Sequence, residues 1–98
     1  MIDKYIVPLA NMLLEWKLYD ESAKWLSMGV RACEEAADII PYIRKKMDLL
    51  SYMLDVYIES ENKEKCRELV AQIDAMNAQY KEYGIKIDIS DEVRNAIQ

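Results

Sequence analysis

Apolar residues recur at intervals of three and four along most of the chain, which is the spacing of amphipathic helices. The first stripe of this kind consists of Ile6, Leu9, Leu13 and Leu14. We expect its helix to begin between Tyr5 and Pro8, because proline is tolerated where the backbone N–H needs no partner.

A second stripe predicts a helix that contacts neighbours on two sides. Its wide apolar face consists of Leu26, Val30, Cys33, Ala37 and Ile40, with Trp25, Gly29, Ala32 and Ala36 beside them. Asp20 is the expected N-cap, since its carboxylate can accept a hydrogen bond from a first-turn N–H. Pro41 predicts that this helix ends or is sharply kinked near Asp38.

Two further stripes predict a second pair of helices. The third helix has Ile43, Met47, Leu50, Leu54 and Tyr57 on its apolar face, and the fourth has Cys66, Leu69, Val70, Ile73, Met76 and Tyr80. Asn62 is expected to cap the fourth helix at its start, and Gly84 to end it in the left-handed conformation.

After Gly84 the period changes. Ile85, Ile87 and Ile89 alternate with charged residues, which predicts a short extended segment that packs as a tether, and Ser90 is expected to cap a last short helix. The chain is therefore predicted to be all-α, with four main antiparallel helices as two stacked hairpins and this short segment and helix at the end. We expect a single helical domain, 1–98, with hairpins at 1–40 and 41–83 and a tail at 84–98.

A shift of 44 residues brings the two hairpins into register. Ile6 then falls on Leu50, and Leu13 on Tyr57. Because one hairpin cannot bury its apolar face alone, the repeat favours stacking of the two units. A plain bundle of four antiparallel helices is the alternative.

In this register the chain resembles a tetratricopeptide repeat. Its first helix is matched by Ile6, Leu9, Ala10 and Leu13, and its turn and second helix by Tyr19, Asp20, Glu21, Ser22 and Gly29. The match departs from the family in its period, which is about 34 residues there. Lys17 and Glu61 also stand in place of the family's turn glycine.

The resemblance implies a groove lined by the first helix of each hairpin. Its residues would be Lys4, Val7, Asn11, Leu14 and Glu15 in the first unit, and Asp48, Ser51, Asp55, Ile58 and Glu59 in the second. The family's clamp for a peptide carboxylate needs Lys or Arg there, and this groove is mainly acidic. We expect a basic or amphipathic peptide instead, with Asp55 and Glu59 as charge partners and Ile58 as the apolar contact.

The aromatic residues are all Tyr or Trp, whose polar atoms suit half-buried positions and interfaces. Trp16, Tyr19 and Trp25 gather about the first predicted turn. They either form an exposed contact patch or pack that turn against the third helix, and the sequence leaves both open. The methionines at 12, 28, 47, 53 and 76 are expected to fill the core, and an adaptable binding surface is the alternative.

Composition narrows the possible partners. The 98 residues include 13 Lys and Arg against 18 Asp and Glu, a net charge of -5, which disfavours nucleic acid and an anionic membrane surface. No apolar run approaches the roughly 18 residues of a membrane span. Cys33 and Cys66 are too few for a disulfide framework, so we expect reduced thiols and a cytoplasmic protein.

Nothing in the sequence predicts catalysis, a metal site or a cofactor. The chain has no His, no Cys-x-x-Cys pair, and only two glycines, too few for a phosphate loop. We expect a non-enzymatic protein- or peptide-interaction module, which could be a regulatory or scaffolding domain of a larger protein. A homo-oligomerisation domain, acting as a homodimer, and a small acidic inhibitor or nucleic-acid mimic are the alternatives.

Overall fold

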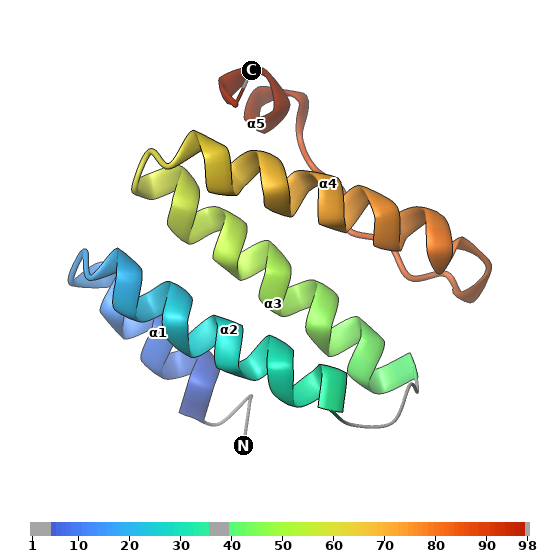
Figure 1. The fold of residues 1–98 in the computed structure, drawn as a ribbon, viewed down its shortest axis with the longest axis horizontal. Helices are drawn as coiled ribbons and strands as arrows, with labels where there is room; N and C mark the ends of the chain where they lie inside the picture. The colour runs from blue at the N-terminus through green and yellow to red at the C-terminus, as the bar shows by residue number, and fades with distance from the viewer. Residues whose placement is uncertain (1–4, 36–39, 98) are drawn as a thin grey trace.

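The protein is seen in a computed structural model that describes residues 5–35 and 40–97, and every regular element in these ranges is helical (Figure 1). The elements are α1 (Val7–Glu15), α2 (Tyr19–Glu35), α3 (Ile40–Glu59), α4 (Lys63–Gln79), the 3-10 turn η2 (Lys81–Tyr83) and α5 (Asp91–Ala96). No strand occurs in the described ranges. The predicted all-α fold is confirmed.

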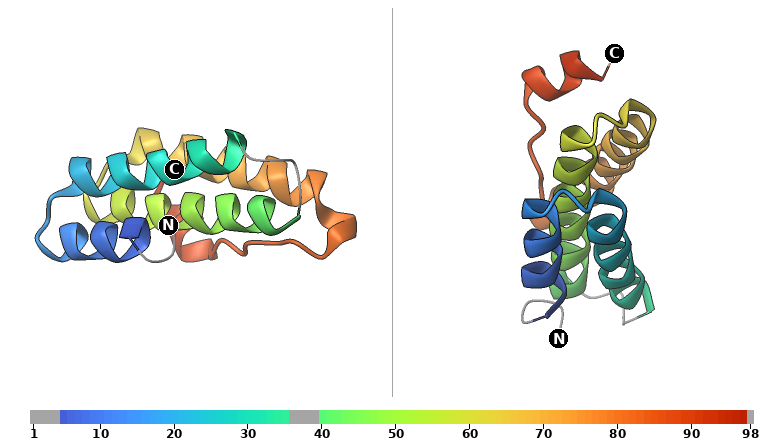
Figure 2. Two further views of the ribbon diagram at one scale, coloured as in Figure 1. Left: turned by 90° about the horizontal axis from the view of Figure 1, so that it is seen from below. Right: turned by 90° about the vertical axis from the view of Figure 1, so that its left-hand side faces the viewer.

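The helices form an open stack of two hairpins. Consecutive helices pack on one another, α1 on α2, α2 on α3 and α3 on α4, whereas α1 and α4 share no comparable interface in the described part of the chain. The molecule is correspondingly thin, at 35 × 33 × 16 Å. Figure 2 shows α2 and α4 in one layer, with α1 and the tail on the other side of α3. As its wide stripe predicts, the second helix contacts neighbours on two sides.

Prolines stand at the start of two helices. Pro8 occupies the first turn of α1, and Pro41 is the second residue of α3. The assignment of Ile40 to the second helix is wrong, because Ile40 opens α3 and is exposed. A proline in a first turn leaves no hydrogen bond unmade, so Pro41 starts a helix instead of only ending one. Asp38 and Ala37 lie outside the described residues.

Side-chain caps begin two of the helices as predicted. Asn62 Oδ1 accepts the N–H of Lys65 at 3.2 Å, and Ser90 Oγ accepts the N–H of Val93 at the same distance. The prediction for Asp20 is wrong. Helix α2 starts one residue earlier, at Tyr19, so Asp20 lies inside its first turn, where a negative charge is favourable near the helix N-terminus.

The turns within the two hairpins have the same backbone. Lys17 and Glu61, 44 residues apart, have left-handed φ angles of 61° and 59°. The N–H of Lys17 donates to the carbonyl of Leu14 and that of Leu18 to Leu13, both at 2.9 Å. The corresponding bonds of the second turn measure 3.1 and 3.0 Å. Each turn is therefore a Schellman motif, in which the left-handed position is usually glycine.

A buried hydroxyl joins the first two helices. Ser22 on α2 is fully buried, and its Oγ donates to the carbonyl of Ala10 on α1 at 2.8 Å. Burial of this polar atom is tolerated because the hydrogen bond replaces the one it would make with water.

The tail runs back along the second hairpin after η2 (Figure 1). Gly84, with a φ of 70°, closes η2, whereas α4 has already ended at Gln79, so the glycine does not end α4 directly as predicted. Ile85 and Ile97 are buried, and Ile87, Ile89 and Val93 pack against the core. The segment is extended and unpaired with any strand in the described residues, as expected of a tether.

Candidate functional site

The five groove residues predicted to bind a partner lie on α1 and α3. Asn11 and Glu15 are exposed on α1, and Asp55, Ile58 and Glu59 are exposed on α3. Two of the residues that the resemblance assigns to a groove, Val7 and Leu14, instead pack against the core. Lys4 lies outside the described residues.

Asp55 and Glu59 are exposed acids one turn apart on α3, and together they form what we call the acidic surface. Partial burial, and secondly the negative charge of Glu59, raise the pKa of Asp55. Neither carboxylate forms an ion pair with any residue that the structure describes. A cation supplied from outside would relieve this repulsion.

An apolar cavity lies beside this acidic surface. Ile58 borders a cavity of about 490 Å³ between the α3–α4 turn and the tail helix, lined by Tyr57, Ile58, Glu61, Lys63, Cys66, Ala96 and Ile97. Burial raises the pKa of the Cys66 thiol, which keeps it protonated and weakly reactive. Sequence reasoning missed the part played by the tail, because only the fold brings residues 96 and 97 next to the turn at residue 61.

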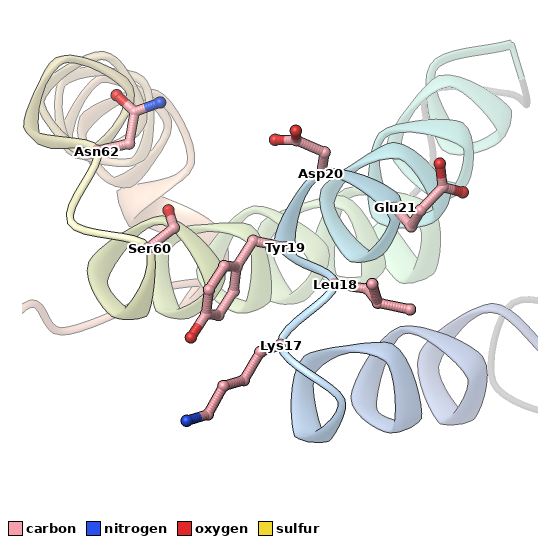
Figure 3. Close-up of a pocket in the computed structure, with 7 residues that line it drawn as sticks. All are labelled: Lys17, Leu18, Tyr19, Asp20, Glu21, Ser60 and Asn62. Atoms are coloured by element: carbon pink, nitrogen blue, oxygen red, sulfur yellow. The ribbon is translucent and has the colours of Figure 1, made fainter.

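The three aromatic residues near the first turn do not form one patch. Figure 3 shows Tyr19 lying between the two turns beside Ser60, in a second cavity of about 490 Å³. Trp16 is instead 62% exposed, and Trp25 is half-buried farther along α2. Of the two readings left open, packing of the turn fits Tyr19, and an exposed contact surface fits Trp16.

Trp16 belongs to an apolar surface on the first hairpin, which we call the outer face. It consists of Tyr5, Met12, Trp16, Leu18 and Met28, each between 38% and 67% exposed, with half-buried Leu9 and Trp25. The prediction that the methionines fill the core is confirmed for Met47 and Met76, and Met53 is half-buried. It is wrong for Met12 and Met28, because helical spacing identifies an apolar face but not whether a neighbour covers it.

The described residues include no group of three or more His, Cys, Asp or Glu side chains placed to hold a metal ion. Within the same residues, no helix has both the length and the apolar character needed to cross a bilayer. The chain matches no protein-family model, no curated protein and no solved structure, so its function has to be inferred from the surfaces described above.

Proposed function

We propose that the chain is a non-enzymatic protein- or peptide-interaction module built from two tetratricopeptide-like hairpins. The repeat is supported by the two turns, whose backbone hydrogen bonds recur with the 44-residue shift. Lys17 and Glu61, which replace the family's turn glycine, hold the left-handed conformation that glycine favours. The open stack supports the hairpin repeat over a closed four-helix bundle.

The binding surface that we propose is the exposed part of α3 together with the neighbouring cavity. The observation that carries this proposal is that Asp55 and Glu59, which form no ion pair with the described residues, lie beside Ile58, and that the pKa of Asp55 is raised. A Lys or Arg of a bound peptide would pair with the carboxylates, while an apolar side chain of the same peptide enters the cavity at Ile58. An amphipathic basic peptide satisfies both demands.

The two parts of this surface contribute unequally to affinity. An exposed ion pair contributes roughly 0–1 kcal/mol, since solvent and salt screen it. An apolar anchor that fills a cavity is worth more, typically about 2 kcal/mol or above for the best-placed residues of an interface. The carboxylates therefore select the partner, and the cavity supplies most of the binding free energy.

We further propose that this module acts in the cytoplasm. Cys33 and Cys66 lie in α2 and α4 as buried thiols, which supports a reducing compartment.

Selection from a random peptide display library tests the proposal. The immobilised protein should enrich peptides in which Lys or Arg flanks a large apolar residue. Asp55→Lys with Glu59→Lys should abolish that enrichment, and Ile58→Ala should weaken binding of the selected peptides about tenfold.

A matched control is available on α4. Glu64 and Glu68 are also exposed acids one turn apart, so Glu64→Lys with Glu68→Lys makes the same change of net charge elsewhere. The control should keep the enrichment. Equal loss in both double variants, or enrichment without basic residues, contradicts the proposed function.

A further inference from the structure

The part of the outer face that lies on α1 is equivalent to a surface of α3 that is already an interface. With the 44-residue shift, Tyr5 and Leu9 correspond to Leu49 and Met53. Both of these α3 residues contact α2. The Cδ1 atom of Leu49 lies 3.0 Å from the position of a Cβ at Gly29, and Ser27 Oγ donates to the Met53 sulfur at 3.9 Å.

Met12 is a further exposed α1 residue whose equivalent on α3 is buried. It corresponds to Val56, which is buried in the core, while Met12 itself is exposed. Helix α1 thus presents to solvent the side by which α3 packs on α2. On α2, Ser27 marks the flank that faces α3, and Trp25 and Met28 extend the outer face on the other flank.

The opposite end of the stack is closed by the tail. Three buried residues of α2, Ala23, Val30 and Cys33, correspond to Arg67, Asp74 and Asn77 on α4. Each of these three polar residues bonds to the tail. Arg67 Nε donates to the carbonyl of Ile97, Arg94 donates to both carboxylate oxygens of Asp74, and the Asn77 amide pairs with the backbone of Ile87.

The closed end determines how copies of the chain can meet. A head-to-tail assembly would require the outer face of one copy to pack where the tail of the next already lies. Two outer faces can meet each other without displacing any segment that the structure describes. A contact of this kind has two-fold symmetry and ends at two subunits.

The area of the outer face is enough for such a contact. Five side chains that average about half exposure, at ~200 Å² each, present roughly 500 Å² of mostly apolar surface. A stable interface buries about 800 Å² per partner, of which roughly 55–65% is apolar. Trp, Tyr and Met, which form most of this face, are also the residues enriched at interfaces.

We propose that two copies of the chain pair through the outer face of the first hairpin, with Trp16 and Met28 in the contact. This inference goes beyond the proposed function, because it uses a different surface. The acidic surface of α3 stays accessible to a peptide in both copies.

Sedimentation equilibrium over a hundredfold range of protein concentration tests this pairing. The wild type should have twice the monomer mass at the upper end of the range and dissociate on dilution. Trp16→Glu with Met28→Glu should raise the dissociation constant at least a hundredfold. Both residues are exposed, so the far-UV circular dichroism spectrum and melting curve of this variant at low concentration should match those of the wild type.

Two further variants keep the test specific. Tyr52→Glu with Tyr83→Glu makes the same charge change at exposed tyrosines outside the outer face, and should remain dimeric. Asp55→Lys with Glu59→Lys should also remain dimeric, which separates this proposal from the peptide-binding one. A wild type that stays monomeric throughout the range, or a dimer that survives the Trp16 and Met28 changes, overturns the proposal.

Discussion

Gly29 on α2 lies so close to Leu49 on α3 that a Cβ at Gly29 would be 3.0 Å from Leu49 Cδ1. The same Cβ would be 3.4 Å from Cγ2 of Ile6, which precedes α1. Leu49 is fully buried and has little room to move. Glycine at this position therefore allows three successive segments of the stack to approach one another.

Enlarging Gly29 should destabilise the protein in proportion to side-chain size. Gly29→Ala is expected to change the free energy of unfolding by less than about 1 kcal/mol, since better helix propensity offsets the overlap. Gly29→Val should cost about 2–3 kcal/mol, because its added methyl groups overpack the core. Urea denaturation measures both. Ala32→Val, at an exposed position of α2, should cost no more than about 0.7 kcal/mol.

Relief of backbone strain at the two turns should stabilise the chain. A residue with a side chain pays about 1–2 kcal/mol of conformational free energy in the left-handed region, and Lys17→Gly and Glu61→Gly remove this cost. The greater freedom of glycine in the unfolded chain cancels part of this gain, leaving about 0.5–1 kcal/mol for each. The melting temperature should rise. Lys24→Gly, inside α2, should lower it, and a fall in all three variants would contradict the assigned turn geometry.

The acidic pair on α3 should make stability depend on pH. An acid whose pKa is raised by folding destabilises the folded state above that raised pKa. This penalty disappears as the pH falls through the raised pKa and below the ordinary Asp range. Asp55→Asn should therefore stabilise the protein at neutral pH, by at most about 0.5 kcal/mol at so exposed a site, and the gain should vanish in acid.

Urea denaturation from pH 7 to pH 3 measures this difference. Asp48→Asn, two turns earlier on α3, serves as the control and should leave stability nearly unchanged. A gain for Asp55→Asn that persists unaltered in acid would show that repulsion and burial of the carboxylate are not its cause.

The ion pair between Asp74 on α4 and Arg94 on α5 should stabilise docking of the tail helix. The hydrogen bonds from Arg94 are the largest effect on the pKa of Asp74 and lower it; burial opposes them, and the positive charge of Arg94 adds a smaller lowering effect. A lowered pKa stabilises the docked tail above the ordinary Asp pKa, and this contribution is lost as the pH falls through the lowered value. Docking should thus weaken only in strong acid.

Arg94→Gln should remove most of this contribution at neutral pH. Hydrogen exchange at the Ile97 amide, which donates to Val93, should become faster, while exchange within α2 stays unchanged. Lys86→Gln breaks a more exposed pair with Asp88 and should leave tail exchange as it is. If the Ile97 amide exchanged equally slowly in the wild type and in Arg94→Gln, the ion pair would not stabilise docking of the tail.

Local chemistry made most of the fold predictable. Asn62 and Ser90 cap helices because their side chains reach an N–H three residues ahead, and that relation is visible in the sequence. Asp20 has the same chemistry but lies one residue inside its helix, since the Schellman turn at Lys17 brings the chain into helix earlier. Helix boundaries depend on such turn geometry more than on capping preference.

The candidate surfaces were less predictable, because they depend on which neighbour covers each face. Trp16 and Tyr19 are three residues apart, yet one faces solvent and the other lies between the turns. Met12 has the apolar character of a core residue but is exposed, because no described element covers its side of α1. The cavity beside Ile58 arises from contact with residues near the far end of the chain.

The polar residues under the tail also limit how the molecule could grow. Arg67, Asp74 and Asn77 satisfy their hydrogen bonds on the tail, and an apolar hairpin added in its place would leave all three buried without partners. Lengthening this repeat would need three coordinated substitutions as well as displacement of the tail. The same three polar residues oppose open-ended polymerisation. They lie at the α4 end of the stack, which therefore does not match the apolar outer face at the other end.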